Sequence, residues 1–308
     1  MNFESFTFAV RFQPGMRPGF GDIKALQTKL NSQSYDLVVV YSNDAAELFL
    51  DGQLKLPKGT PLLLENYNGE PSLDQKRELN MTAVLTVFQP YENARLGLQL
   101  LPDIRQVVLL VGATADGLRQ CELLRSAPKE ISQKITIIDG AQYTTAEMLE
   151  KVRELPPHTS INFHSWGAAL DETPTNTYAI LSQIKQFFPG LILGRYDTYM
   201  PLGSAGGFIV IGSEVGKPTG NLAIRILNGE QPAAIPYEYT QTHCRLDYRA
   251  IQKFNIPASR IPTGVEIVNT PPDFLIRYRV QLATGGGILF LILSGFIGAL
   301  LFRLYKQQ

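Results

Sequence analysis

Short apolar runs recur along most of the chain, and they are rich in Val, Ile and Leu. The runs show little alternation between apolar and polar side chains. That pattern is typical of strands buried on both faces, and therefore of parallel sheets. The predicted strands are 37–41, 62–64, 83–88, 107–111, 135–138, 160–163, 191–193 and 208–211.

Segments with helical spacing of apolar residues lie between these runs. Polar residues able to cap a helix precede two of them, at Asn43-Asp44 and Thr144-Thr145. Repeated strand and helix predict βαβ units and an α/β fold with parallel sheets. The predicted helices are 22–30, 45–50, 92–101, 116–125, 145–153, 178–187 and 219–227.

The C-terminal segment 280–302 has no charged residue. As a helix rising ~1.5 Å per residue it would be about 34 Å long, enough to cross a bilayer core of ~30 Å. The sequence therefore predicts a transmembrane helix here. Pro271 and Pro272 predict a stiff, extended approach to it, and we expect Asp273 to cap its first turn.

Composition excludes several classes of protein. The 28 basic residues balance 28 acidic ones, which argues against a nucleic-acid-binding protein. A hydrophobic share of 44% argues against disorder. Cys121 and Cys244 are too few for a disulfide-dense scaffold or a four-cysteine zinc site. They either pair in an oxidising compartment or, as we expect, remain free thiols. No metal or cofactor site is predicted.

Ligands of parallel sheets bind beyond the carboxyl ends of the strands, so polar residues that follow the apolar runs are candidates. The candidate ligand-binding residues are Asn43, Asp44, Glu65, Asn66, Tyr91, Thr114, Trp166, Asp197 and Thr198. Gly194, Gly203, Gly206 and Gly207 are candidate positions for a hinge or for close approach of the backbone to a ligand.

Most of these residues also have a structural interpretation. Asn43 and Asp44 fit a helix cap. Trp166, the single tryptophan, fits ligand stacking and core packing equally well. Asp197 and Thr198 are the strongest candidates for ligand contact, with capping or a hinge as the alternative.

The charges of the candidates suggest a ligand class. Asp44, Glu65 and Asp197 follow three different strands, and together they would favour a cationic or amine-bearing ligand, such as an amino acid or a polyamine. Tyrosines near the same strand ends suit an organic ligand with an apolar part.

A catalytic function is not predicted. His164, Ser165 and Asp197 are residue types that hydrolases use, but the chain lacks a G-x-S-x-G elbow. It also lacks the H-E-x-x-H pattern of zinc peptidases.

Several segments, in this order, resemble the periplasmic ABC-type substrate-binding-protein-like sensor domains of bacterial membrane-bound sensor histidine kinases and diguanylate cyclases. The resemblance covers nearly the whole chain. The segments are YDLVVVYSNDAAELFL, LPKGTPLLLENYN, LGLQLLPDIRQVVLLVG, LGRYDTYMPLGSAGGFIVIGSEVGKPTGNLAIRILNGEQP and FNIPASRIPTGVEIVNTPPDFLIRYR.

The resemblance implies a two-lobed, type I periplasmic-binding-protein-like fold with a ligand cleft between the lobes. By this analogy, lobe 1 comprises residues 1–101 and 194–229, and lobe 2 comprises 102–193 and 230–260. A connector 261–279, a transmembrane helix 280–302 and a cytoplasmic tail 303–308 follow.

The resemblance also implies a function. The soluble domain would lie in the periplasm or outside the cell, anchored in the inner membrane, with a cytoplasmic C-terminus. It would bind a small organic ligand and signal by lobe closure through segment 280–302, which would contact lipid and form a homodimer.

The chain departs from the family pattern at both ends. It opens on FESFTFAVRFQ, which is similar to the family's second strand, so lobe 1 is expected to lack its first strand. No kinase or cyclase module follows the apolar segment. Two alternatives therefore stay open, a membrane-tethered solute-binding component of an ABC transporter and a truncated, non-signalling remnant.

Overall fold

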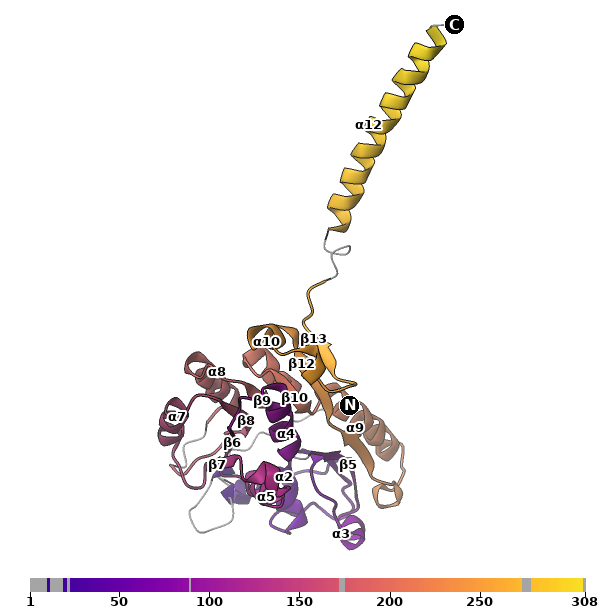
Figure 1. Ribbon diagram of the computed structural model, residues 1–308. Helices are drawn as coiled ribbons and strands as arrows, with labels where there is room; N and C mark the ends of the chain where they lie inside the picture. The colour runs from indigo at the N-terminus through magenta and orange to yellow at the C-terminus, as the bar shows by residue number, and fades with distance from the viewer. Residues whose placement is uncertain are drawn as a thin grey trace. The chain divides into compact units, whose positions relative to one another are not determined.

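The computed structural model describes residues 10–11, 19–20, 23–88, 90–171, 175–272 and 278–306. The chain divides into two units, Met1–Val268 and Asn269–Gln308 (Figure 1).

Lobe 1 is built on a four-stranded parallel sheet with the order β11-β5-β4-β3. Leu62 and Leu64 pack toward α1 and α2, while the intervening Leu63 packs toward α9. Both faces of β4 are therefore covered, which explains why its sequence does not alternate. The elements are β3 (Val38–Tyr41), β4 (Leu62–Tyr67), β5 (Met81–Val87), β11 (Glu238–Gln241), α1 (Ile23–Asn31), α2 (Asn43–Leu50), α3 (Leu73–Glu78), α9 (Gly212–Leu227) and η2 (Pro232–Ala234).

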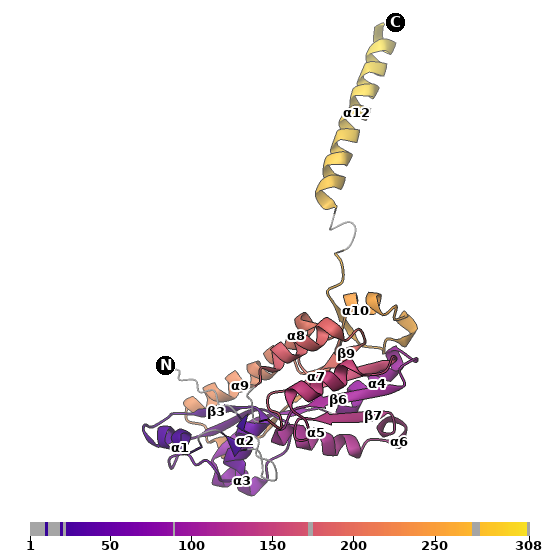
Figure 2. The ribbon, with the colours of Figure 1, turned by 90° about the vertical axis from the view of Figure 1, so that its left-hand side faces the viewer.

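Lobe 2 is built on a second four-stranded parallel sheet with the order β7-β6-β8-β9. Figure 2 shows the two lobes on opposite sides of the unit, with α2 of lobe 1 close to α5 of lobe 2. The elements are β6 (Gln106–Val111), β7 (Ile135–Asp139), β8 (Thr159–Ser165), β9 (Ile192–Gly194), α4 (Pro90–Leu100), α5 (Ala115–Arg125), α6 (Lys129–Ser132), α7 (Thr145–Arg153) and α8 (Thr177–Phe187).

A third sheet, with the order β10-β12-β13, packs against lobe 2. β12 is antiparallel to β10 and parallel to β13. Leu246 of β12 shares a core cluster with Leu96 of α4 and Leu193 of β9. The elements are β10 (Gly206–Ile209), β12 (His243–Asp247), β13 (Glu266–Val268), α10 (Tyr248–Lys253), η1 (Asp197–Leu202) and η3 (Ala258–Arg260).

The predicted α/β class with parallel sheets is confirmed, since every predicted strand and helix corresponds to an observed element. α3, α6 and α10 were not predicted. Each has six residues or fewer, too short to show a helical period in the sequence.

The structure assigns three segments, α4, β10 and β11, to other sheets or lobes than the division predicted from the sequence. α4 packs with lobe 2, because Leu96 and Leu100 share its core cluster with Leu191. β10 pairs with β12 rather than with the lobe 1 sheet. β11 completes the lobe 1 sheet by pairing with β5, Glu238 opposite Val84. In addition, β13 belongs to the folded unit, so the connector begins after Val268.

Asn93 ties together two places where the chain passes between the lobes. Its side chain is 1% exposed. Nδ2 donates to the carbonyl of Gly194 (2.9 Å), and Oδ1 accepts from the amide of Phe208 (2.6 Å). The beginning of α4 is thus bonded to the segments on either side of η1.

The structure describes part of the N-terminal segment and most of the C-terminal apolar segment. Of the strand expected in FESFTFAVRFQ, the structure describes β1 (Val10–Arg11), which pairs antiparallel with β2 (Gly19–Phe20). In the second unit, α12 (Arg279–Lys306) contains a stretch, Val280–Ala299, long and apolar enough to cross a membrane by length and composition. Asp273, predicted to cap this helix, lies outside the described residues.

Candidate functional site

The central strands of the two lobes each carry an extra residue near the carboxyl end. In β4 the register passes from Glu65 to Tyr67 and leaves out Asn66. In β8 it passes from Phe163 to Ser165 and leaves out His164. Such bulges redirect a side chain and are over-represented beside functional sites. Asn66 and His164 are 2% exposed.

A buried charged cluster lies between the lobes, centred on Asp116 in the first turn of α5. Its Oδ2 accepts a hydrogen bond from Arg195 Nη1 (2.6 Å) and lies 2.8 Å from His164 Nε2. Its Oδ1 accepts from Asn43 Nδ2 of α2 (2.5 Å) and Gln120 Nε2 (3.2 Å). The carboxylate therefore joins lobe 1 to lobe 2.

The charges of this cluster follow from burial and pairing. Burial alone would raise the pKa of Asp116, but Arg195 and His164 hold that pKa well below its ordinary value, so the carboxylate is ionised. Burial and the nearby guanidinium lower the pKa of His164. The imidazole is therefore neutral at pH 7, and its Nε2 lies 2.8 Å from Asp116 Oδ2 and 2.7 Å from Arg195 Nη1.

Arg195 is the most buried charged residue of the cluster, at 1% exposure. Its Cζ lies 4.8 Å from the centroid of the Phe88 ring and 5.3 Å from that of Tyr196. Its Nε and Nη2 atoms are buried and have no hydrogen-bond partner in the part of the chain that the structure describes. Buried polar groups are normally bonded, so these two donors need an explanation.

Tyrosines surround the cluster on the side of Arg195. Tyr196 and Tyr178 each meet Tyr199 edge-on, with centroid separations of 5.4 and 5.8 Å. Tyr41 at the end of β3 and Tyr178 at the start of α8 are 58% and 48% exposed. Aromatic side chains from both lobes thus lie near the guanidinium, partly open to solvent.

Asn66 connects two of these tyrosines. Burial raises the pKa of Tyr196, and a hydrogen bond from Asn66 opposes that rise. Asn66 is also hydrogen bonded to Tyr41. A hydrogen bond that lowers a phenol pKa is one donated to the phenol oxygen, so the Asn66 amide nitrogen is the donor. Its Oδ1 is buried and has no partner among the described residues.

Further contacts hold the lobes together around the cluster. Arg119 of α5 donates to Glu47 of α2 (2.7 Å) and to the carbonyl of Asn68. Asp44 Oδ1 accepts from the amide of Asp116 (3.1 Å). The first turns of α2 and α5 are thereby in direct contact, and these bonds join the two lobes on this side.

Three of the predicted site residues, Asn43, Asp44 and Asn66, lie in or beside this cluster. Thr114 instead caps α5, its hydroxyl accepting from the amide of Gly117 (3.0 Å). Burial raises the pKa of Glu65, which is hydrogen bonded to Thr219 of α9.

The other predicted contacts have structural surroundings. Trp166 is 0% exposed within the lobe 2 core, and its Nε1 donates to Thr145 (3.1 Å). Tyr91 packs beside the cluster that contains Cys121. Asp197 accepts a hydrogen bond from the amide of the exposed Thr198 (2.9 Å) at the start of η1.

The predicted glycines lie around the segment that crosses between the lobes. Gly203 ends η1 with φ 113°. Gly206 and Gly207 also have positive φ, and a Cβ would meet the Arg245 backbone at one and Asn93 at the other. At Gly194 a Cβ would lie 2.9 Å from Ser204 Oγ.

Arg195, Asp116 and Phe88 were missed in the sequence, and His164, although it follows an apolar run, is not among the predicted ligand-binding residues. Arg195 directly follows the apolar run of β9, the position where the strand-end rule looks for ligand contacts. Arg195 stands between an apolar run and an aromatic residue, a setting that indicates burial. A buried arginine in turn indicates an acidic partner, because arginine is almost never buried unless paired.

Cys121 in α5 and Cys244 in β12 are both free thiols, as expected. Burial raises the pKa of Cys121 to about 12 and that of Cys244 to about 11. Both thiols are therefore protonated and unreactive at neutral pH.

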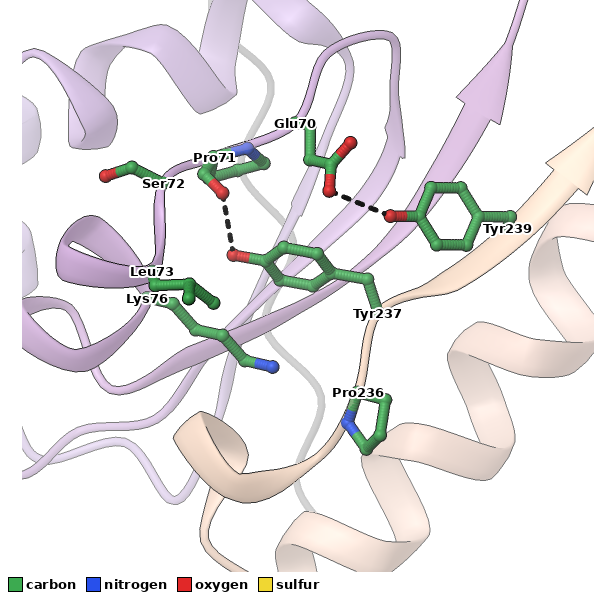
Figure 3. A pocket seen from close by; sticks show the side chains of 8 residues that line it. All are labelled: Glu70, Pro71, Ser72, Leu73, Lys76, Pro236, Tyr237 and Tyr239. Carbon is green, nitrogen blue, oxygen red and sulfur yellow. Dashed lines mark hydrogen bonds between the residues drawn. The ribbon is translucent and has the colours of Figure 1, made fainter.

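A surface pocket of about 560 Å³ lies elsewhere, at the edge of the lobe 1 sheet (Figure 3). Lys76 donates to the carbonyl of Ile235 (2.5 Å) and lies 4.4 Å from the Tyr237 ring centroid. Thr82, near the start of β5, bonds the same carbonyl. The pocket therefore lies near the amino end of this sheet, away from the charged cluster.

No protein-family model matches the sequence, and no curated protein matches it. Solved structures do match. An ABC domain in complex with L-Trp from Streptococcus pneumonia has a TM-score of 0.60 at 15% identity and covers 80% of this chain and 83% of that chain.

A conserved domain protein from Vibrio cholerae has a TM-score of 0.60 at 11% identity, covering 79% of this chain and 83% of that one. The ligand-free, open structure of a substrate binding protein with adhesive properties from Clostridium difficile has a TM-score of 0.52 at 14% identity, covering 81% and 83%. At these identities the likeness concerns the fold, and the unit Met1–Val268 has the two-lobed α/β architecture of type I periplasmic binding proteins.

Proposed function

We propose that this chain is the extracytoplasmic ligand-binding sensor domain of a membrane-anchored bacterial signalling protein. One observation carries the proposal. A buried polar cluster with unpartnered hydrogen-bonding atoms lies between two lobes, beside the bulged residues Asn66 of β4 and His164 of β8. Such a site suits a ligand that replaces the missing partners as the lobes close around it.

The proposed mechanism is a shift between open and closed lobes. A ligand favours closure only to the extent that it binds the closed state more tightly. Contacts such as the one between Arg119 and Glu47 stabilise the closed arrangement. The change in lobe position would pass through the connector to α12, which would span the inner membrane as a homodimer with a cytoplasmic C-terminus.

A solute-binding component of a transporter is the alternative. The structural neighbours, an ABC domain with L-Trp and a substrate binding protein, support ligand capture in either setting. An apolar helix that follows the binding unit is the observation that favours a sensor.

A thermal-unfolding screen tests ligand binding. The full chain in detergent micelles would be heated with amino acids, polyamines, organic acids, nucleobases and sugars. One compound class should raise the unfolding temperature, since a ligand at 100 times its Kd adds about 2.7 kcal/mol. A cooperative transition that no compound moves would count against the proposal.

Membrane crossing and orientation need a separate measurement. A protease would be added outside intact cells and inside-out vesicles that contain the full chain. We expect the soluble unit to be cleaved only from outside and a C-terminal tag only from the cytoplasmic face. Cleavage of both on the same side would contradict the sensor arrangement.

A further inference from the structure

Arg195 has one complete edge of its guanidinium without a partner. Nη1 bonds Asp116, whereas the buried Nε and Nη2 atoms bond nothing among the described residues. Nε and Nη2 form a fork of parallel N–H donors, and that spacing matches the two oxygens of a carboxylate. Donors of a buried cation are costly to leave unpaired.

We infer that the Nε–Nη2 edge of Arg195 binds the carboxylate of an organic acid that carries an aromatic ring, in the cleft between the lobes. This inference rests on the proposed function and names its ligand class. It makes Arg195 the residue that selects the ligand by charge.

The acidic side chains near the cleft already have partners. Asp116 pairs with Arg195, and Asp44 accepts from the amide of Asp116. Glu65 bonds Thr219, and Asp197 accepts from its own turn. Each of these carboxylates thus has at least one partner, whereas two buried donors of Arg195 have none among the described residues. The inferred ligand is for that reason an anion, which reverses the ligand charge that the three carboxylates suggest in the sequence.

A second anion beside Asp116 also needs electrostatic support. Asn43 and Asp116 lie in the first turns of α2 and α5, and both contribute to the cluster. Helix N-termini carry partial positive charge, which stabilises anions within the first turn. The two helix N-termini thus offset part of the negative charge of Asp44 and Asp116, which lie in those first turns.

The surrounding side chains define the rest of the ligand. Tyr196 lies against the guanidinium and Tyr41 interacts with it electrostatically, while Tyr178 meets Tyr199, the ring that adjoins Tyr196. Such a group of rings suits an aromatic ligand. The unpartnered Oδ1 of Asn66 is an acceptor. It would take a hydrogen bond from a donor on the ligand, such as a hydroxyl, an amide or an amino group.

The test uses probes that differ only in the head group. The full chain in detergent would be titrated calorimetrically with 3-phenylpropionate, L-phenylalanine and phenethylamine, and with the indole analogues 3-indolepropionate, L-tryptophan and tryptamine. We expect compounds with a carboxylate to bind, and the amines without one to bind about 30-fold more weakly or not at all.

Arg195→Lys is the matching variant, because lysine keeps the charge but loses the fork. It should weaken the carboxylate probes about 30-fold. Arg225→Lys is the control, since Arg225 is an exposed residue of α9 and pairs with Glu230, which follows that helix. It should leave the affinity unchanged.

Asn66→Asp is the second test variant. It replaces Arg195→Lys if that variant shows no cooperative unfolding transition and is therefore not folded. Aspartate tolerates the positive φ of this position (56°) and places a negative charge beside Tyr196. Asn66→Asp should weaken binding of the carboxylate probes and leave binding of the amine probes unchanged or tighter.

The outcomes separate the two proposals. Binding of amines or sugars but not of carboxylates would overturn this inference and leave the proposed function standing. Carboxylate affinity that is unchanged in Arg195→Lys would also overturn it. Failure of every compound in the probe series and in the wider screen would contradict the proposed function itself.

Discussion

Arg195 and Asp116 are 79 residues apart in the sequence, yet Arg195 Nη1 lies 2.6 Å from Asp116 Oδ2. Their side chains are 1% and 13% exposed. Asp116 is also bonded to Asn43 of the other lobe. This ion pair therefore lies where the two lobes meet, and the first two predictions below depend on it.

Asp116→Asn should destabilise the protein strongly. The amide has nearly the same size, but it leaves the buried guanidinium without a counter-ion, which costs about 3–5 kcal/mol. Thermal unfolding of the full chain measures the effect. Asp74→Asn is the control, because Asp74 is 96% exposed in a surface pair and should change stability by under about 0.5 kcal/mol. A loss below about 1 kcal/mol in Asp116→Asn would contradict the role of the pair.

His164 should make stability dependent on pH. The imidazole faces Asp116 and Arg195, and burial lowers its pKa in the folded state. As pH falls below about 6.5 the unfolded chain binds a proton that the folded chain does not, so stability falls. The contribution of Asp116, whose folded pKa is depressed, is present above about pH 4 and is lost only below it.

His164→Gln should therefore flatten the loss of stability between pH 6.5 and 5, up to about 1.4 kcal/mol per pH unit in the native protein. His158→Asn is the control, since His158 is exposed and asparagine suits its φ of 64°. The slopes, measured by thermal unfolding at each pH, are compared rather than the absolute stabilities. An unchanged slope in His164→Gln would show that His164 takes up a proton while folded.

Arg119→Ala should weaken ligand binding more than folding. The Arg119–Glu47 pair joins the lobes and is 34% and 24% exposed at its side chains. Its loss should lower stability by under about 1 kcal/mol. Because it should also reduce the population of the closed state, ligand affinity should fall by up to about fivefold. Arg153→Ala, which breaks a pair within lobe 2, should leave affinity unchanged. Equal ligand affinities in the two variants would argue against a role of the Arg119–Glu47 pair in stabilising the closed state.

Asn93→Ala should affect the crossing segments. It removes the buried hydrogen bonds that the Gly194 carbonyl and the Phe208 amide make with Asn93. The expected cost is about 2–4 kcal/mol, because buried groups lose their partners without gaining water. Asn31→Ala on the exposed end of α1 is the control. Chemical denaturation measures both, and similar losses in the two variants would contradict the account.

The fold could be predicted from the sequence because the strands are covered on both faces. Runs such as 107–111 and 62–64 are apolar without alternation, which indicates a parallel sheet. The assignment of segments to lobes could not be predicted in detail. α4 and β11 are placed by packing and pairing partners far away in sequence, Leu246 for α4 and Val84 for β11.

The site could be predicted only in part. The strand-end rule found Asn43, Asp44 and Asn66, which adjoin the cluster. It did not find Asp116, which lies inside a helix, or the pairing that allows Arg195 to be buried. Such a pair depends on tertiary contact, and nothing local in the sequence specifies it.

The most direct test of ligand capture between the lobes is the distance between them. Lys58→Cys in lobe 1 and Glu130→Cys in lobe 2 are at exposed positions and would carry spin labels, with Cys121→Ala and Cys244→Ser removing the native thiols. The account predicts a broad or long distance in the free protein and one short distance when a carboxylate probe is bound. A probe that raises the unfolding temperature but leaves the distance distribution unchanged would contradict closure of the lobes around the ligand.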